Sequence, residues 1–79
     1  MNLYLLTQDV ETGYDTYDSV VVAAKTETDA KSIHPEGDDA WRYWSGCWPW
    51  SPESVSVKLI GKAVKGTPAG VILSSFNAG

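Results

Sequence analysis

The sequence has little of what usually stabilises or anchors a very small protein. Cys47 is its only cysteine, so no disulfide can form within the chain, and a zinc site would need His34 and scattered carboxylates. No stretch approaches the roughly 20 apolar residues of a membrane-spanning helix. Residues 1–13 lack the basic start and apolar core of a secretory signal. We therefore expect a cytoplasmic protein without a metal or cofactor.

Positive charge is also scarce. Six Lys and Arg residues stand against ten Asp and Glu, which gives a formal net charge of −4. Such a field repels a phosphate backbone, so binding to duplex DNA is disfavoured. A small nucleotide is not excluded, because backbone N–H groups, aromatic faces and one arginine can hold a single phosphate.

The length of 79 residues predicts one domain, residues 1–79. A chain of this size buries only about 60% of the surface that its unfolded form exposes, so its core is small. Without disulfides or a metal, the remaining sources of stability are aromatic packing and association with a second copy. The sequence therefore favours a homo-oligomer.

The apolar pattern predicts an α+β fold in the order ββαββ. A single, mainly antiparallel sheet of four strands would carry one short helix on one face, and a long Trp-rich loop would connect the helix to the third strand. Thr26 or Thr28 can cap the helix, and Pro35 ends it. The expected strands are residues 2–8, 17–24, 55–63 and 71–79, the helix lies within 25–37, and the loop spans 35–54.

The first two strands are apolar on both faces. Val20, Val22 and Ala24 alternate with Val21 and Ala23, so neither face of the second strand is polar. One face can meet the helix, but a chain this short has little left to cover the other. Either the Trp-rich loop or a second copy of the protein would have to cover it.

No residue pattern indicates catalysis. His34 stands next to a helix-ending proline, where a histidine usually caps the helix or interacts with its dipole. The carboxylate pairs Asp15/Asp18 and Asp38/Asp39 are typical of solvated loops. No phosphate-binding loop, dinucleotide fingerprint or metal motif occurs. We expect a protein that is not an enzyme.

The segment "GYDTYDS" (13–19) is a first candidate binding site. Its tyrosines can stack on a ring and its carboxylates can bind ribose hydroxyls or base edges. The alternative is a hairpin tip with turn-forming acids and two tyrosines that pack across strands. The candidate residues are Tyr14, Asp15, Tyr17 and Asp18.

The segment "WRYWSGCWPW" (41–50) holds all four tryptophans and the only arginine. An aromatic side chain buries about 150–250 Å², so the rings can supply the core of a small domain. Arginine among aromatic rings is also typical of an anion pocket and of a protein interface. The three alternatives of core, ligand pocket and interface concern Trp41, Arg42, Tyr43, Trp44, Trp48 and Trp50.

Four segments together resemble a group of very small proteins encoded by bacteriophages and prophages. They are "GYDTYDSVVVAA", "DAKSIHP", "VSVKLIGKA" and "GVILSSFNAG", and the resemblance covers nearly the whole chain. Phage proteins of this size without catalytic motifs are often agents against host defence. The resemblance therefore implies an anti-defence role in the host cytosol.

Three functions are compatible with these observations. The preferred hypothesis is a non-catalytic sponge, a homo-oligomer that sequesters a small nucleotide-like immune signal. Its alternative is an inhibitor that binds and occludes a bacterial defence protein, in the manner of anti-CRISPR proteins. The third is a phage housekeeping factor.

Overall fold

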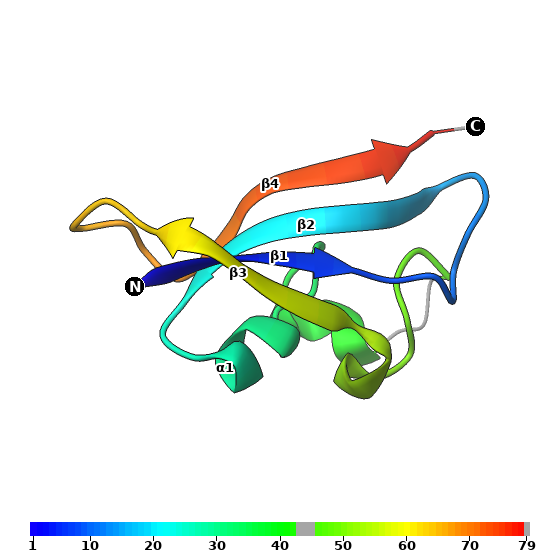
Figure 1. The fold of residues 1–79 in the computed structure, drawn as a ribbon. Coiled ribbons are helices and arrows are strands. Elements are labelled where there is room, and N and C mark those ends of the chain that lie inside the picture. The colour runs from blue at the N-terminus through cyan, green and yellow to red at the C-terminus, as the bar shows by residue number, and fades with distance from the viewer. Residues whose placement is uncertain (43–45, 79) are drawn as a thin grey trace.

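In the computed structural model, which describes residues 1–42 and 46–78, the chain forms one antiparallel sheet with a short α-helix (Figure 1). The four strands lie in the order β3, β1, β2, β4. The prediction of a small α+β fold with one sheet and one short helix is confirmed. In chain order the elements are β1 (Asn2–Thr7), β2 (Thr16–Ala24), α1 (Glu27–Lys31), the 3-10 helices η1 (Asp38–Arg42) and η2 (Pro52–Ser54), β3 (Ser56–Lys62) and β4 (Gly70–Asn77).

One face of the sheet carries the core. Tyr4 pairs with Val22 and Leu6 with Val20 across β1 and β2, and all four side chains are buried. Because alternate residues of a strand point to opposite faces, these four lie together on the same face. The helical elements cover this face (Figure 1). The buried core is made of Tyr4, Leu6, Val20, Val22, Ala24, Ala30, Cys47, Trp48 and Val55.

The helix α1 is shorter than predicted. It has five residues instead of about two turns within 25–37. The Thr26 hydroxyl accepts a hydrogen bond from the Asp29 N–H at 3.1 Å, which fixes its start. Proline disfavours helical backbone in the residue before it, here His34, so α1 cannot extend beyond Ile33, but this does not account for its end at Lys31. Only Ala30 of α1 is buried, so the helix covers little of the core by itself.

The Trp-rich segment provides the rest of the cover on the same face. The expected loop of residues 35–54 contains η1 and η2, and Cys47, Trp48 and Pro49 between them are buried. In Figure 1 the described part of this segment lies on the same side of the sheet as α1. The opposite face of the sheet is therefore not covered by the described part of the segment.

Candidate functional site

The tip of the β1–β2 connection is organised by Gln8, a residue that the sequence did not single out. Its amide nitrogen donates to the carbonyl oxygens of Glu11 (2.7 Å) and Tyr17 (2.6 Å). Its amide oxygen accepts from the backbone N–H groups of Val10 and Glu11. One side chain thus fixes both sides of the turn, and only long-range contacts reveal this role.

The four candidate residues of the tip differ in exposure. Tyr14 is 77% exposed, and Asp15 and Asp18 are exposed as well. Asp15 has a φ of 60°, and its N–H donates to the Asn77 carbonyl oxygen at 2.6 Å. Asp18 accepts a hydrogen bond from the neighbouring Ser19 hydroxyl. These residues therefore shape the turn as well as offering polar groups to solvent.

Tyr17 belongs to the body of the protein. Its ring lies 4.8 Å from the ring of Phe76, and its backbone N–H donates to the Cys47 carbonyl oxygen at 2.9 Å. Burial raises the pKa of its phenol, with smaller contributions from Glu36 and Cys47. Tyr17 thus connects β2 to β4 and to the Trp-rich segment.

Trp48 is part of the core. Its side chain is 1% exposed, and its indole N–H has no hydrogen-bond partner among the described residues. An unpaired buried N–H costs about 1–3 kcal/mol, which the large apolar area of the ring must offset. Of the three alternatives of core, ligand pocket and interface, Trp48 therefore fits the core.

Trp41 has an intermediate position on η1. It is half-buried, and its indole N–H donates to the Ser32 carbonyl oxygen at 2.9 Å. Its ring meets that of His34 edge to face, with centroids 4.9 Å apart. These two contacts attach η1 to the end of α1.

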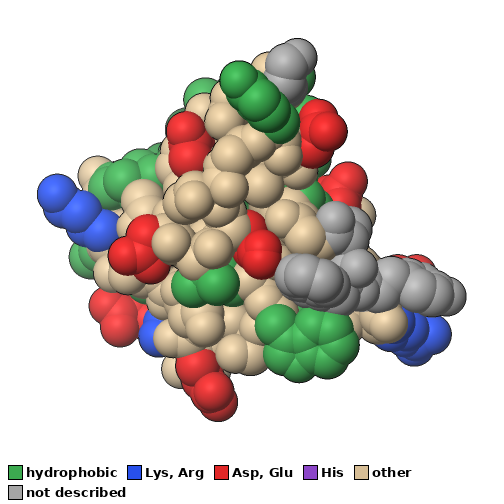
Figure 2. Space-filling model, turned by 90° about the vertical axis from the view of Figure 1, so that its right-hand side faces the viewer, with side chains coloured by type: hydrophobic (Ala, Val, Ile, Leu, Met, Phe, Trp, Pro, Cys, Tyr) green, Lys and Arg blue, Asp and Glu red, His purple; other side chains and the backbone are tan. Residues whose placement is uncertain are grey.

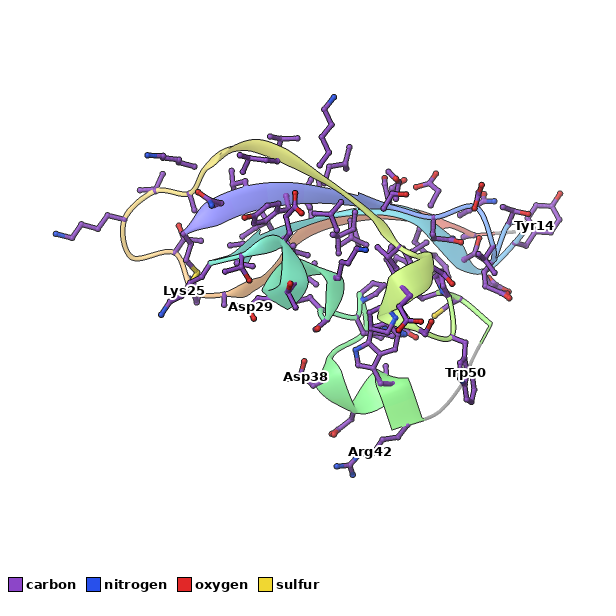
Figure 3. All side chains as sticks on the ribbon, turned by 60° about the horizontal axis from the view of Figure 1, so that its bottom comes forward. Tyr14, Lys25, Asp29, Asp38, Arg42 and Trp50 are labelled. Carbon is purple, nitrogen blue, oxygen red and sulfur yellow. The ribbon has the colours of Figure 1, made fainter. Side chains whose placement is uncertain are left out.

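Arg42 and Trp50 are the exposed members of the cluster. Arg42 ends η1, and Trp50 is 71% exposed. Figure 3 shows Arg42 below the sheet and Tyr14 at one end of it, so these two candidates do not converge on one pocket. Tyr43 and Trp44 lie outside the described residues.

His34 is buried beyond the end of α1 and stabilises a turn rather than the helix itself. Its Nδ1 accepts a hydrogen bond from the Glu36 N–H at 3.0 Å. Burial lowers the pKa of the imidazole, and the nearby Glu36 carboxylate partly opposes this. The folded protein therefore favours neutral His34.

This lowered pKa predicts a loss of stability in mild acid. The unfolded chain, with a histidine pKa of about 6.5, binds the proton more readily than the folded chain. The contribution of His34 is thus fully present above about pH 6.5 and decreases as the pH falls through the folded pKa. Denaturant titrations between about pH 7 and pH 5 should show this decrease, and His34→Asn should reduce it. An unchanged slope in His34→Asn would contradict the assignment.

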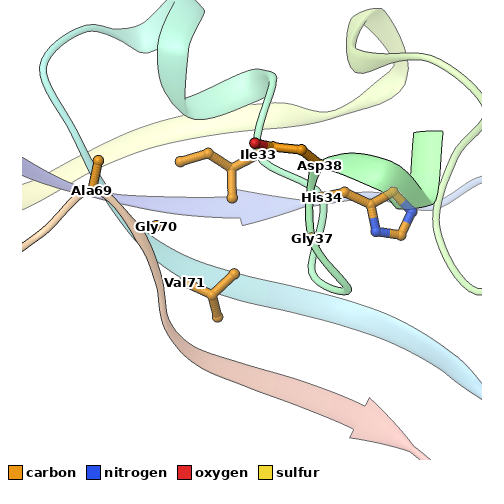
Figure 4. Close-up of a pocket in the computed structure, with 7 residues that line it drawn as sticks. All are labelled: Ile33, His34, Gly37, Asp38, Ala69, Gly70 and Val71. Atoms are coloured by element: carbon orange, nitrogen blue, oxygen red, sulfur yellow. The ribbon is translucent and has the colours of Figure 1, made fainter. Parts of the chain in front are cut away.

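A shallow hollow of about 330 Å³ lies beside His34 (Figure 4). It is lined by residues that follow α1 and by the start of β4, and Asp38 is its only charged lining residue. No predicted ring or arginine lines it. The lining residues are Ile33, His34, Gly37, Asp38, Ala69, Gly70 and Val71.

The second face of the sheet, here called the open face, is apolar, and none of the described helical elements covers it; Leu3, Leu5 and Val21 are half-buried there and Ala23 is buried. The register places Leu5 opposite Val21 and opposite Lys58, and Val21 opposite Leu73. Leu73 is 69% exposed. A hollow of about 300 Å³ lies here between β2 and β4, lined by Ser19, Val21, Leu73, Ser74 and Ser75. The open face comprises Leu3, Leu5, Val21 and Leu73, with Lys58 as the one charged residue paired among them.

The charges are separated along the strands. Exposed Asp9, Asp15 and Asp18 lie at the end with the β1–β2 connection, whereas Lys25 and Lys62 lie near Asn2 at the other end. Viewed from the acidic end, acidic side chains are spread over the surface and basic ones lie at its margins (Figure 2). This field favours a basic partner at the tip and disfavours a phosphate there.

The comparisons with known proteins gave no family for the chain. No protein-family model, no curated protein and no solved structure matches it. Within residues 1–42 and 46–78, no three His, Cys, Asp or Glu side chains are grouped to hold a metal ion. No helix in this part of the chain is long and apolar enough to cross a membrane.

Proposed function

We propose that the protein is a non-catalytic inhibitor that binds another protein through the open face of its sheet. The observation that carries this proposal is that none of the described helical elements covers the second apolar face of the sheet, where Leu73 is exposed and Val21 is half-buried. Large exposed apolar surfaces of soluble proteins are typically binding sites, because leaving them in water is unfavourable. Leu73, at 69% exposed, is the clearest example.

The chemistry of the open face specifies the partner. An apolar side chain of the partner fits the hollow beside Val21 and Leu73. Lys58 lies on the edge strand β3, opposite Leu5 of β1, and burying its ammonium group is unfavourable unless a carboxylate pairs with it. The partner surface is therefore apolar with an acidic residue placed against Lys58.

A second copy of the chain does not meet this requirement face to face. The paired positions of its open face hold no carboxylate, and the nearest one, Asp18, accepts a hydrogen bond from Ser19 at the hairpin end of β2 and not at the position of Lys58. Two open faces packed together would bury two lysines without partners. The occupant of this face is therefore a different protein, and the resemblance to small phage proteins points to a bacterial defence protein.

The nucleotide-sponge hypothesis stays a prediction. Trp48 is inside the core, and Trp41 and Tyr17 already pack against other rings or nearby side chains. These contacts leave fewer aromatic ring faces free to stack on a nucleotide than the sequence alone suggested. Titration of tryptophan fluorescence with cyclic and ADP-ribose-derived nucleotides tests it, and saturable quenching would favour the sponge over the protein-binding function.

Charge reversal on the open face gives the direct test. Lys58→Glu should weaken binding at least 10-fold, because the ammonium that pairs with the partner's carboxylate becomes a repelling charge. Lys65→Glu makes the same change in the exposed β3–β4 connection and should bind like the wild type. If this protein is expressed in the host with an affinity tag, the partner should co-purify with it and can be identified. Calorimetry with the purified partner would then measure the affinity of the wild type and of each variant.

A second pair of variants tests the apolar part of the face. Leu73→Glu places a charge beside the hollow, and Val64→Glu places one at a position that is 81% exposed outside the sheet. Loss of binding in Leu73→Glu and Lys58→Glu alone supports the proposal. Equal affinity of all four variants would place the contact elsewhere and refute it. The inhibitory role further requires that expression of the wild type, but not of Lys58→Glu, relieves defence in phage-plating assays.

A further inference from the structure

The two edge strands of the sheet differ in their protection against pairing. The edge strand β3 carries Lys58 and Lys62 and has a bulge at Ile60, where the register with β1 shifts. Lysines and bulges are common devices that keep an edge strand from pairing with another chain. The β3 edge is therefore protected.

The other edge, β4, lacks these charges. Its sequence from Gly70 to Asn77 contains no Lys, Arg, Asp, Glu or Pro. Leu73 is 69% exposed and Phe76 47%, on a strand whose outer backbone groups have no neighbouring strand. In a chain with a net charge of −4, this uncharged edge is where two copies can approach without repulsion.

The part of the β4 edge without a bulge is short, and hydrogen bonds fix its end. The register with β2 shifts at Ile72, which bulges from β4, and again at Asp18, which bulges from β2, so β4 has no bulge of its own from residue 73 to 77. Its last residue is fixed to the hairpin tip, because the Asn77 amide donates to the Gly13 carbonyl oxygen at 2.6 Å and the Asn77 carbonyl oxygen accepts from Asp15. A partner strand thus meets an edge that is already ordered, which lowers the entropic cost of pairing.

From these features we propose that two copies pair through antiparallel β4 edges and form one continuous eight-stranded sheet. In an antiparallel pair, directly opposed side chains lie on the same face. In a dimer with two-fold symmetry, the axis must therefore lie between two copies of the same residue, one from each chain, and not between two different residues. The segment 73–77 has Ser75 at its centre, so Ser75 faces Ser75 of the second copy.

The proposed dimer is compatible with the positions of the acidic side chains and with protein binding at the open face. Antiparallel pairing directs the two hairpin tips, with Asp15, toward opposite ends of the dimer, and Asp18 lies one strand away from the paired edges, on β2. It uses the edge of the sheet and leaves Lys58 and Leu5 of both open faces exposed. The two open faces become parts of one larger surface, so the dimer can form whether or not the protein partner proposed above exists.

The test places like charges on the proposed axis. Ser75→Lys puts two lysines directly opposite each other, which destabilises a strand pair. Ser54→Lys adds the same charge at an exposed position of η2 and is the matched control. Light scattering after size-exclusion chromatography should give twice the 8.6 kDa chain mass for the wild type and Ser54→Lys, and the monomer mass for Ser75→Lys.

Cross-linking tests the register separately. Opposed residues of antiparallel strands have Cα atoms about 4.5–5.5 Å apart, within the range that a disulfide spans. Ser75→Cys should therefore form a covalent dimer under mild oxidation, and Ser54→Cys should form much less. A wild type that stays monomeric, or a Ser75→Lys variant with the dimer mass, would overturn the proposal. Equal cross-linking of Ser75→Cys and Ser54→Cys would refute the placement of the two-fold axis at Ser75.

Discussion

Val20→Asp is expected to abolish folding, whereas Val21→Asp, one residue further along the same strand, should leave a folded protein. Val20 is 1% exposed and pairs with Leu6 on the covered face. Removing one partner of a buried charge pair costs about 3–5 kcal/mol, and an aspartate at Val20 has no partner at all. The total free energy of unfolding of a small domain is on the order of 5 kcal/mol.

The same carboxylate at Val21 lies on the open face, where water can reach it. We expect a cost of about 1–2 kcal/mol there, from lost strand propensity and lost apolar contact. Circular dichroism and urea titration of the two variants measure this difference. If both variants unfolded, the open face would be covered in solution, and if both folded, the core would lie elsewhere.

Trp48→Ala is expected to lower the free energy of unfolding by about 3–5 kcal/mol, the usual cost of truncating a large core aromatic. The ring is 1% exposed and belongs to the buried cluster that includes Leu6 and Val20. Its loss would leave a cavity between the sheet and the Trp-rich segment. Urea titration followed by far-ultraviolet circular dichroism measures the change, because this readout does not depend on tryptophan emission.

Trp50→Ala is the matched control in the same segment. Its side chain is 71% exposed, so the same truncation should change the free energy of unfolding by about 1 kcal/mol or less. Trp48→Phe should cost less than Trp48→Ala, since it keeps a ring and removes an N–H that has no partner among the described residues. Equal effects of the two alanine variants would show that Trp48 is no more important to the core than Trp50.

The proposals for function and assembly use surfaces that the fold leaves without internal contacts. Protein binding rests on the open face with Lys58 on its β3 edge, and dimerisation rests on the uncharged β4 edge around Ser75. Lys58→Glu should lose partner binding and keep the dimer mass, because Lys58 lies on the opposite edge strand. Ser75 also lines the hollow of the open face, so Ser75→Lys is judged by its mass alone. Lys58→Glu therefore distinguishes a failure of one proposal from a failure of the other.

The local pattern of the sequence was sufficient to predict the strands. Alternating and β-branched residues such as those of β2 indicate extended backbone wherever the strand finally packs. The single cysteine likewise excluded an internal disulfide, and the count of acids set the sign of the overall field. These properties depend on neighbouring residues or on composition, so they need no knowledge of the fold.

The uses of the tryptophans depended on the tertiary structure. Trp48 and Trp50 are two residues apart in the same segment, yet one is 1% and the other 71% exposed. The role of Gln8 could likewise not be predicted, because its hydrogen bond reaches Tyr17, nine positions further along the chain. Contacts between distant segments determine the roles of these residues, and the local sequence pattern does not indicate such contacts.

The sequence by itself determined that the sheet has two apolar faces and that the chain has too few residues to cover both. Only the tertiary structure decided which face is covered. The described part of the Trp-rich segment packs with α1 against Leu6 and Val20, because burying Trp48 there completes one closed core. One continuous core buries more apolar surface than two thin layers, and this leaves Val21, Leu73 and the β4 edge available to partners.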